Sequence, residues 1–332
     1  MNQSSFAPGR IELLGHSGNF DQNLVLSAAI NLGVKACGCA RPDERIILSS
    51  SGHHDATYFG EPMFLEPKHN WADYPFGVAK VLALSGYRIH GFDFHYESTL
   101  PSGLGLCSSS AFEVATIILL SKIFDLDIPP AEIARICRIA EREFININSR
   151  MHDHAASIFG KHDYLMLVDD RRESVVHMPA GADLAILILS VKGTSLRHTG
   201  SFQSTSHSDD DVLAGMGFLR QGDIESFGRL MTNSCREPSG SQELDTLRSL
   251  ATATKGIYGA RLTNGAAGGA VIALADVRQS KDASKHILSK YASLTSQKAV
   301  SHHCMISSGA VSGAVPAKAA RSNPREACLA LS

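Results

Sequence analysis

Hydrophobic and polar residues follow two periods along this chain. Stretches in which alternate residues are apolar predict strands, whereas apolar residues three and four positions apart predict helices. In the first half, the expected strands cover residues 24–34 (with a turn at Gly33), 45–50, 92–97 and 164–168. The expected helices there cover residues 71–86, 109–124 and 130–144, the last beginning at a Pro-Pro pair that suits a helix start.

The second half predicts a similar mixture after a charged turn, DDRRES at residues 169–174, which we expect to join two domains. Strands are expected at residues 184–190 and 271–274, and helices at 212–220, 224–232 and 242–254. The last residues are rich in small side chains without a clear pattern, so we expect a loosely held tail. The predicted organisation is an N-terminal domain of residues 1–175, a C-terminal domain of residues 176–315 and a tail of residues 316–332.

Composition narrows the class of protein. A chain of 332 residues is long enough for two domains, and 44% apolar with 19% charged residues is ordinary for a globular protein. A net charge of −2 gives no reason to expect a nucleic acid or an anionic membrane as partner. The start of the chain has no signal-peptide pattern, and its most apolar stretch, residues 185–191, is too short to cross a bilayer. The seven cysteines include no CxxC pair, so we expect a reduced, cytoplasmic protein without a disulfide framework or zinc ribbon.

Fifteen histidines raise the question of a metal site. His152 and His154 flank Asp153, and residues 53–54 and 302–303 are adjacent histidine pairs. Side chains one or two positions apart on a helix diverge, so none of these sets converges on one ion by itself. We interpret the histidines as surface and loop residues.

The clearest chemical signal is the glycine-rich stretch LPSGLGLCSSSAFEVATIILL, residues 100–120. It has neither the lysine of a Walker A loop nor the third glycine of a dinucleotide fingerprint. Gly103 and Gly105 permit a tight turn, and the serines that follow open a helix, where free N–H groups and the helix dipole attract anions. Ser110 and Glu113 have the spacing of a capping box, which supports a helix start there. An ordinary loop-to-helix turn is the alternative interpretation.

Two carboxylates are candidates for chemistry. Glu141 borders the apolar stripe of the helix predicted at 130–144, where an acid is costly unless a cation pairs with it. Mg²⁺ would satisfy it, and so would a lysine or an arginine. Asp153 is followed by small residues and is a candidate base or a candidate group for orienting a hydroxyl; the alternative is an acid at a helix N-terminus.

Together these motifs resemble the GHMP kinase superfamily, in particular its galactokinase branch. The resemblance covers roughly residues 6–275, with the motifs in the family's order and spacing. The matching segments are APGRIELLG and LVLSAAI near the start, HNWADYPFGV, LPSGLGLCSSSAFEVA, AEREF with MHDHAASIFG, and IYGARLTNGAAGGAVIAL.

The resemblance implies an α+β fold of two domains, the first similar to domain 2 of ribosomal protein S5 and the second ferredoxin-like, with the site in the cleft between them. It implies ATP and Mg²⁺ as cofactors, a sugar as the other small-molecule partner, and a monomer or weak dimer. Asp153 and Arg10 fall at the family's catalytic positions, and Ser108, Ser109 and Glu141 at its metal ligands. The implied ATP contacts are Gly103, Leu104, Gly105, Leu106, Cys107, Ser108, Ser109, Ser110 and Trp71.

The sugar-binding half departs from the family pattern. Galactokinases usually read Gly-Glu/Asn-His-Thr-Asp-Tyr after the first motif, whereas residues 15–20 here read GHSGNF. The resemblance places the sugar contacts at His16, Ser17, Asn19, Arg150 and Asp153, where the first three replace the family's polar and acidic residues and Arg150 replaces a glycine.

Three hypotheses follow from this departure. The first is an active sugar 1-kinase, with galactose as the first choice of substrate. The second is a kinase for a sugar acid, because His16 and Arg150 add positive charge and arginine suits a carboxylate. The third is a non-catalytic sensor that binds ATP and sugar, because the first motif is changed and Asn264, Ala266 and Ala267 alter the third glycine motif.

Overall fold

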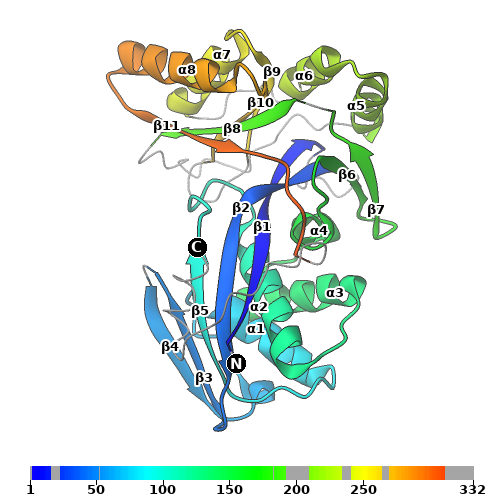
Figure 1. The fold of residues 1–332 in the computed structure, drawn as a ribbon, viewed down its shortest axis with the longest axis vertical. Coiled ribbons are helices and arrows are strands. Elements are labelled where there is room, and N and C mark those ends of the chain that lie inside the picture. Colours follow the sequence, from blue (N-terminus) through cyan, green and yellow to red (C-terminus); the bar gives the residue numbers. More distant parts are fainter. Residues whose placement is uncertain are drawn as a thin grey trace.

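The computed structural model describes residues 2–15, 23–51, 53–181, 183–191, 209–233, 241–263 and 269–310. They form two sheets, each with its helices packed mainly on one side (Figure 1). The first sheet and helices α1 to α4 occupy the lower part of that view. The second sheet lies above them, with helices α5 to α8 on its far side (Figure 1).

The centre of the first sheet is a long antiparallel pair, β1 (Gln3–Leu14) and β2 (Leu24–Ala40). Strand β2 runs straight through Gly33, so the turn expected there is wrong. Gly33 serves a close approach instead, since a Cβ at this position would lie 2.3 Å from the carbonyl oxygen of Ala7 on β1. A glycine in a strand often marks such an approach.

The other strands extend this pair in the order β4-β3-β5-β2-β6-β7. They are β3 (Arg45–Ser50), β4 (His53–Phe59), β5 (Phe92–Ser98), β6 (Tyr164–Asp169) and β7 (Ser174–Pro179). The charged turn DDRRES joins β6 and β7, which pair as an antiparallel hairpin within this sheet. The interpretation of that turn as the joint between domains is therefore wrong, and the first sheet continues to Pro179.

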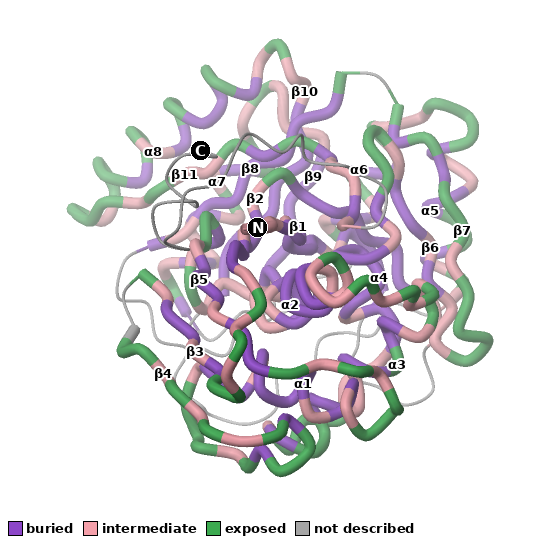
Figure 2. Tube along the Cα trace, turned by 60° about the horizontal axis from the view of Figure 1, so that its bottom comes forward, coloured by how far each residue is buried: buried purple, intermediate pink, exposed green. Residues whose placement is uncertain are grey.

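Helices cover the first sheet. After the short η1 (Pro62–Phe64) come α1 (Asp73–Leu84), α2 (Ser108–Phe124), α3 (Pro130–Ala140), η2 (Glu141–Ile145) and α4 (Met151–Phe159). The helix expected over residues 130–144 changes to a π-helical turn at Glu141, a form that is frequent at functional sites. Figure 2 shows buried residues gathered along β1, β2 and α2.

Helix α2 begins three residues earlier than a capping box with Ser110 as N-cap would require. Ser110 is its third residue, and Glu113 is fully buried and binds a histidine, so the capping-box prediction is wrong. The residue before the helix is Cys107, with a left-handed φ of 55°.

The second sheet confirms the expected ferredoxin-like arrangement. Its strands are β8 (Leu184–Val191), β9 (Ile257–Leu262), β10 (Val271–Asp276) and β11 (Ala299–Cys304), all antiparallel in the order β11-β8-β10-β9. Its helices are α5 (Asp209–Gln221), α6 (Ile224–Asn233), α7 (Gln242–Thr252) and α8 (Ser280–Thr295). One crossover with helices connects β8 to β9 and another connects β10 to β11, while β9 and β10 form a hairpin. This βαββαβ order defines the ferredoxin-like topology.

After β11 the chain returns to the first sheet. Ile306 forms a bridge with Ile30 of β2, and Gly309 donates a hydrogen bond to the carbonyl oxygen of Gly160 at 2.7 Å. The domains are thus joined both before β8 and after β11. Within the described ranges, no helix combines the length and the apolar character that crossing a bilayer demands.

Candidate active site

The glycine-rich loop has the backbone of an anion-binding nest. Gly103, Gly105 and Cys107 have φ values of 74°, 73° and 55°, so left-handed residues alternate with others along the turn. Successive N–H groups in such a turn point toward one concave side and attract anions. The first N–H groups of α2, from Ser108 onward, continue this positive surface.

Contacts from both domains hold the loop in place. The backbone N–H of Arg10 on β1 donates to the carbonyl oxygen of Leu106 at 3.0 Å. Thr263, directly after β9, donates its hydroxyl to the carbonyl oxygen of Leu104 at 2.6 Å. Gly9 makes the first contact possible, because a Cβ there would lie 2.9 Å from the oxygen of Leu106.

Arg10 and Asp153 come together beside this loop, although they are 143 positions apart in the sequence. The guanidinium Nη2 of Arg10 lies 3.4 Å from Asp153 Oδ1, and its Nε donates to the sulfur of Cys107 at 3.1 Å. Burial raises the pKa of the Cys107 thiol, so the thiol is neutral at pH 7 and its sulfur accepts this hydrogen bond. Arg10 is itself 6% exposed, so its charge acts in a poorly solvated place.

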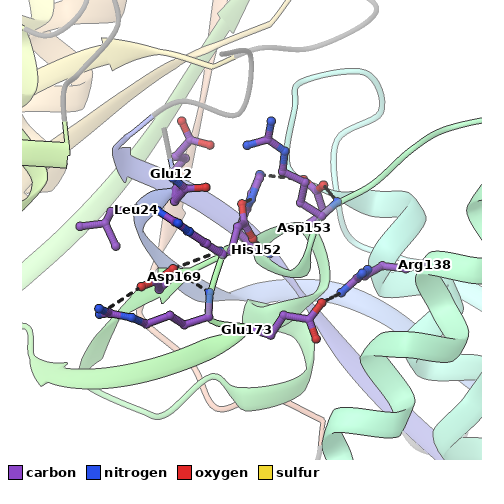
Figure 3. Close-up of polar contacts among 12 residues, drawn as sticks. Glu12, Leu24, Arg138, His152, Asp153, Asp169 and Glu173 are labelled. Atoms are coloured by element: carbon purple, nitrogen blue, oxygen red, sulfur yellow. Dashed lines mark hydrogen bonds and ion pairs between the residues drawn. The ribbon is translucent and has the colours of Figure 1, made fainter. Parts of the chain in front are cut away.

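The Asp153 carboxylate is held on both oxygens. Its Oδ2 accepts the backbone N–H of Arg150 at 2.9 Å, and its Oδ1 lies 3.3 Å from His152 Nε2 (Figure 3). Burial alone would raise the pKa of Asp153. The contacts with His152, Arg10 and the Arg150 N–H outweigh burial and hold that pKa far below its usual range. Asp153 is therefore a firmly ionised group and a weak base.

The glycine-rich loop, Arg10 and Asp153 line one cavity of about 300 Å³. Its wall contains the glycine-rich loop from Gly103 to Ser109 together with Arg10 and Asp153 from the first domain. Arg261 and Thr263 line it from the second domain. The cavity therefore lies between the two domains, where the resemblance places the active site.

Glu12 of β1 connects the cationic groups of this cavity. One carboxylate oxygen lies 3.5 Å from Arg10 Nη1, and the other lies 3.3 Å from Arg261 Nη2. Arg261 also donates to the carbonyl oxygen of Gly15 at 3.3 Å. Sequence reasoning missed Glu12 and Arg261 as site residues, although both stand inside the motifs that carry the resemblance.

Trp71 lines a second cleft, of about 600 Å³, that shares Ser108 and Ser109 with the first cavity. Its ring contacts Tyr96 and Phe112, and its indole N–H donates to the carbonyl oxygen of His54 at 2.9 Å. An aromatic ring fixed in the wall of this cleft suits the stacking of a planar group, and Ser108 and Ser109 in the same wall directly follow the glycine-rich turn.

Glu141 lies in a cluster of buried polar groups. Its carboxylate is 3.8 Å from His154 Nε2, which contacts Glu113 at 2.7 Å. Burial raises the pKa of Glu113 and lowers that of His154, so burial favours the neutral form of each group. Cys137 completes a group of potential metal ligands with Glu113 and His154, a convergence that the sequence pattern did not indicate.

The structure leaves part of the expected sugar site unplaced. His16, Ser17 and Asn19 lie outside the described residues, as do Asn264, Ala266 and the tail from 316 to 332. Arg150 directly precedes α4, and it is not among the residues that line the cavity between the domains.

Models of known protein families match both domains. The GHMP kinases N terminal domain matches residues 73–161, and the GHMP kinases C terminal domain matches residues 216–294. The chain belongs to the GHMP kinase family. The N-terminal match contains the glycine-rich loop, Glu141 and Asp153 of this GHMP kinase, and Arg261 and Thr263 lie between α7 and β10 within the C-terminal match.

Individual relatives extend over most of the chain. It is 26% identical to the galactokinase of Fusobacterium nucleatum over 364 residues, covering 92% of this chain and 93% of that protein. It is 27% identical to the galactokinase of Pyrococcus furiosus over 336 residues, covering 88% of this chain and 94% of the relative. Among solved structures, Lactococcus lactis galactokinase in complex with galactose has the same fold, with a TM-score of 0.82 at 22% identity and coverage of 93% and 94%.

Proposed function

We propose that this GHMP kinase transfers the γ-phosphoryl group of ATP to the anomeric hydroxyl of a monosaccharide, and that galactose, giving galactose 1-phosphate, is its first substrate. The observation that carries the proposal is the Arg10–Asp153 pair in the same cavity as the glycine-rich loop. The relatives that cover most of the chain are galactokinases, which supports a sugar as the acceptor.

The phosphate side of the proposal uses the loop. Phosphoryl transfer depends mainly on positioning and charge neutralisation. The N–H groups of the turn from Gly103 to Cys107 and the start of α2 would hold the phosphates of ATP. The adenine would occupy the cleft beside Trp71, since this cleft meets the cavity at Ser108 and Ser109.

The residues present also fit Mg²⁺. This hard ion prefers oxygen ligands, which Ser108, Ser109 and Glu141 would supply. Glu141 is 3% exposed, and among the described residues its ion-pair partner is His154 at 3.8 Å, with no lysine or arginine within ion-pair distance, so a cation would compensate this buried carboxylate. Bound there, Mg²⁺ would supply charge neutralisation to the transferred phosphate.

On the acceptor side, Asp153 would orient the sugar hydroxyl and Arg10 would stabilise the charge of the transferred group. Two arginines and two carboxylates line the described wall of this cavity, so their charges balance: Arg10 and Arg261 against Glu12 and Asp153. A balanced wall favours a neutral sugar over a sugar acid. We expect His16, Ser17, Asn19 and Arg150 to complete the sugar contacts.

A coupled assay of ADP release with Mg-ATP and a panel of monosaccharides and sugar acids tests the proposal. We expect galactose to give the highest kcat/KM, and Asp153→Asn to lower kcat about 10²- to 10⁴-fold with binding of ATP retained. Asp163→Asn, at an exposed position outside the cavity, is the matched control. If only a sugar acid is phosphorylated, the substrate is a sugar acid and not galactose. If the protein binds ATP but phosphorylates no sugar, it is a sensor and not a kinase.

A further inference from the structure

Glu12 contacts an arginine from each domain, and the proposed function uses it only as a compensating charge. Its Oε2 lies 3.5 Å from Arg10 Nη1, and its Oε1 lies 3.3 Å from Arg261 Nη2. The two arginines are 6% and 4% exposed, and all three side chains line the cavity between the domains. One carboxylate of β1 therefore connects Arg10 of the first domain to a buried arginine of the second.

The strand holds Arg10 and Glu12 on one face. Side chains two positions apart on a strand point the same way, and the pairing of β1 with β2 is regular from Arg10 to Glu12. The register shifts on both sides of this segment, between Pro8 and Arg10 and between Glu12 and Leu14. Such irregularities redirect side chains and are frequent next to active sites. Here they delimit the short segment that presents both charged groups to the cavity.

Arg10 faces a different group at each nitrogen of its planar guanidinium. Nε donates to Cys107 Sγ at 3.1 Å, Nη2 lies 3.4 Å from Asp153 Oδ1, and Nη1 faces Glu12. Because the guanidinium is a rigid plane, three such contacts determine its orientation. Among the described residues Nη1 is buried without a hydrogen-bond acceptor, so an oxygen of a bound phosphate can take this position.

Arg261 is itself held at a fixed place relative to the glycine-rich loop. It pairs with Ile272 in the hairpin of β9 and β10. Thr263, two residues later, donates its hydroxyl to the carbonyl oxygen of Leu104 in that loop at 2.6 Å. The position of the second domain is thus transmitted to the Glu12 carboxylate through a paired strand, whereas Cys107 and Asp153 belong to the first domain.

We propose that Glu12 is a positioning residue: held by Arg261 of the second domain, it orients Arg10 so that Nη1 meets the transferred phosphate. This role rests on the proposed kinase activity. While Arg261 shares the carboxylate, Glu12 stays at 3.5 Å from Arg10 and leaves Nη1 to the phosphate. Without Arg261, the carboxylate would form a charge-assisted hydrogen bond with Arg10 and compete with the phosphate for it. Arg10 is then correctly oriented only while the two domains are in contact.

NMR spectra of the arginine Nε–H groups test this coupling without using activity. The signal of Arg10 is assigned by its loss in Arg10→Lys. We expect Arg261→Met to displace this signal, and we expect the same substitution to leave it unmoved when Glu12→Gln is already present. Arg278→Met is the control, because it breaks an exposed pair with Asp183 and should not move the signal.

Steady-state kinetics with Mg-ATP and galactose then test the role in transfer, with circular dichroism to show that each variant is folded. We expect Glu12→Gln and Arg261→Met each to lower kcat about 10- to 100-fold, because misplacement by about 1 Å can cost 10²-fold. The KM for ATP should change little, since the glycine-rich loop stays in place. The double variant should have the kcat of Glu12→Gln alone, and Arg261→Lys, which keeps the charge, should recover part of the loss. Arg278→Met should keep the wild-type kcat.

Two kinetic results overturn the proposal. One is a double variant whose loss of kcat is the product of the single losses, because Arg261 would then act independently of Glu12. The other is a loss of stability with kcat unchanged, which would make the contact merely structural. If the wild-type protein phosphorylates no sugar, the proposed function fails and the NMR spectra decide the coupling alone. An Arg10 signal that Arg261→Met displaces equally with and without Glu12→Gln overturns it.

Discussion

Replacing Arg261 by methionine should weaken the contact between the two domains and disturb the cavity at the same time. The side chain of Arg261 extends from β9 in the second sheet, and its Nη2 lies 3.3 Å from the Glu12 carboxylate on β1 of the first sheet. Methionine keeps much of the side-chain volume but removes the charge, so the ion-pair partner left to Glu12 among the described residues would be Arg10, at 3.5 Å.

The magnitude follows from distance and burial. Two unit charges 3.3 Å apart attract each other by about 5 kcal/mol at an effective dielectric constant of 20, before the cost of burial is subtracted. The side chains are 5% and 17% exposed, and breaking such a buried pair costs about 3–5 kcal/mol. Arg10 still compensates Glu12 in part, so we expect about 3 kcal/mol.

Urea unfolding, followed by the fluorescence of the single tryptophan and by circular dichroism, measures this loss. The control is Arg278→Met, which breaks a shorter contact of 2.7 Å with Asp183, where the side chains are 76% and 51% exposed. An exposed pair of this kind contributes about 0–1 kcal/mol. Equal urea midpoints for the two variants would refute the reasoning, and a double variant with Glu12→Gln should lose less than the sum of the single losses.

Three other changes have definite expected outcomes. Asp73→Asn should lower the free energy of unfolding by about 2 kcal/mol, because the buried carboxylate accepts hydrogen bonds from three backbone N–H groups of the preceding loop at 2.6–3.3 Å. Thermal denaturation measures this loss, and a loss below about 0.5 kcal/mol would contradict the prediction. Gly259→Ala should abolish soluble expression, since its Cβ would lie 2.0 Å from a backbone oxygen of α6, whereas Gly217→Ala, with nothing within 4 Å, should raise the melting temperature. The pKa of His152 in the folded protein is raised to about 9, so the charged ring contributes about 3 kcal/mol to the free energy of unfolding. This contribution is complete below about pH 6.5 and is lost as pH rises through about 9. The melting temperature measured against pH tests this, and an equal pH dependence in His152→Gln would refute it.

The sequence predicted best those features that depend on neighbouring residues. The left-handed glycines of the loop and the helix after it follow from the local residues Gly103 to Ser110, and the structure has them at those positions. Gly33 shows the limit of such local reasoning. A glycine after an apolar run predicts a turn, but this one is present because the backbone of Ala7 passes close to it.

The pairings at the site could not be derived from spacing. Arg10 meets Asp153 across 143 positions, and only the resemblance to a family indicated that they belong together. The contact between His152 and Asp170 had no such signal, because it depends on where β6 ends relative to the first turn of α4. Glu141 was a middle case, since its position on the helix predicted its burial but not the neighbouring Glu113 and His154.

The return of the chain to β2 after β11 restricts how the two halves can move. Ile306 and Gly309 attach this segment to the first domain, which makes a second crossing in addition to the one between Pro179 and Leu184. A body tethered at two points rotates freely only about the axis through both. Any opening of the cavity between Arg10 and Arg261 should therefore be a rotation of the second domain about this axis. Cutting the chain before residue 305 would remove one connection and allow rotation about other axes as well.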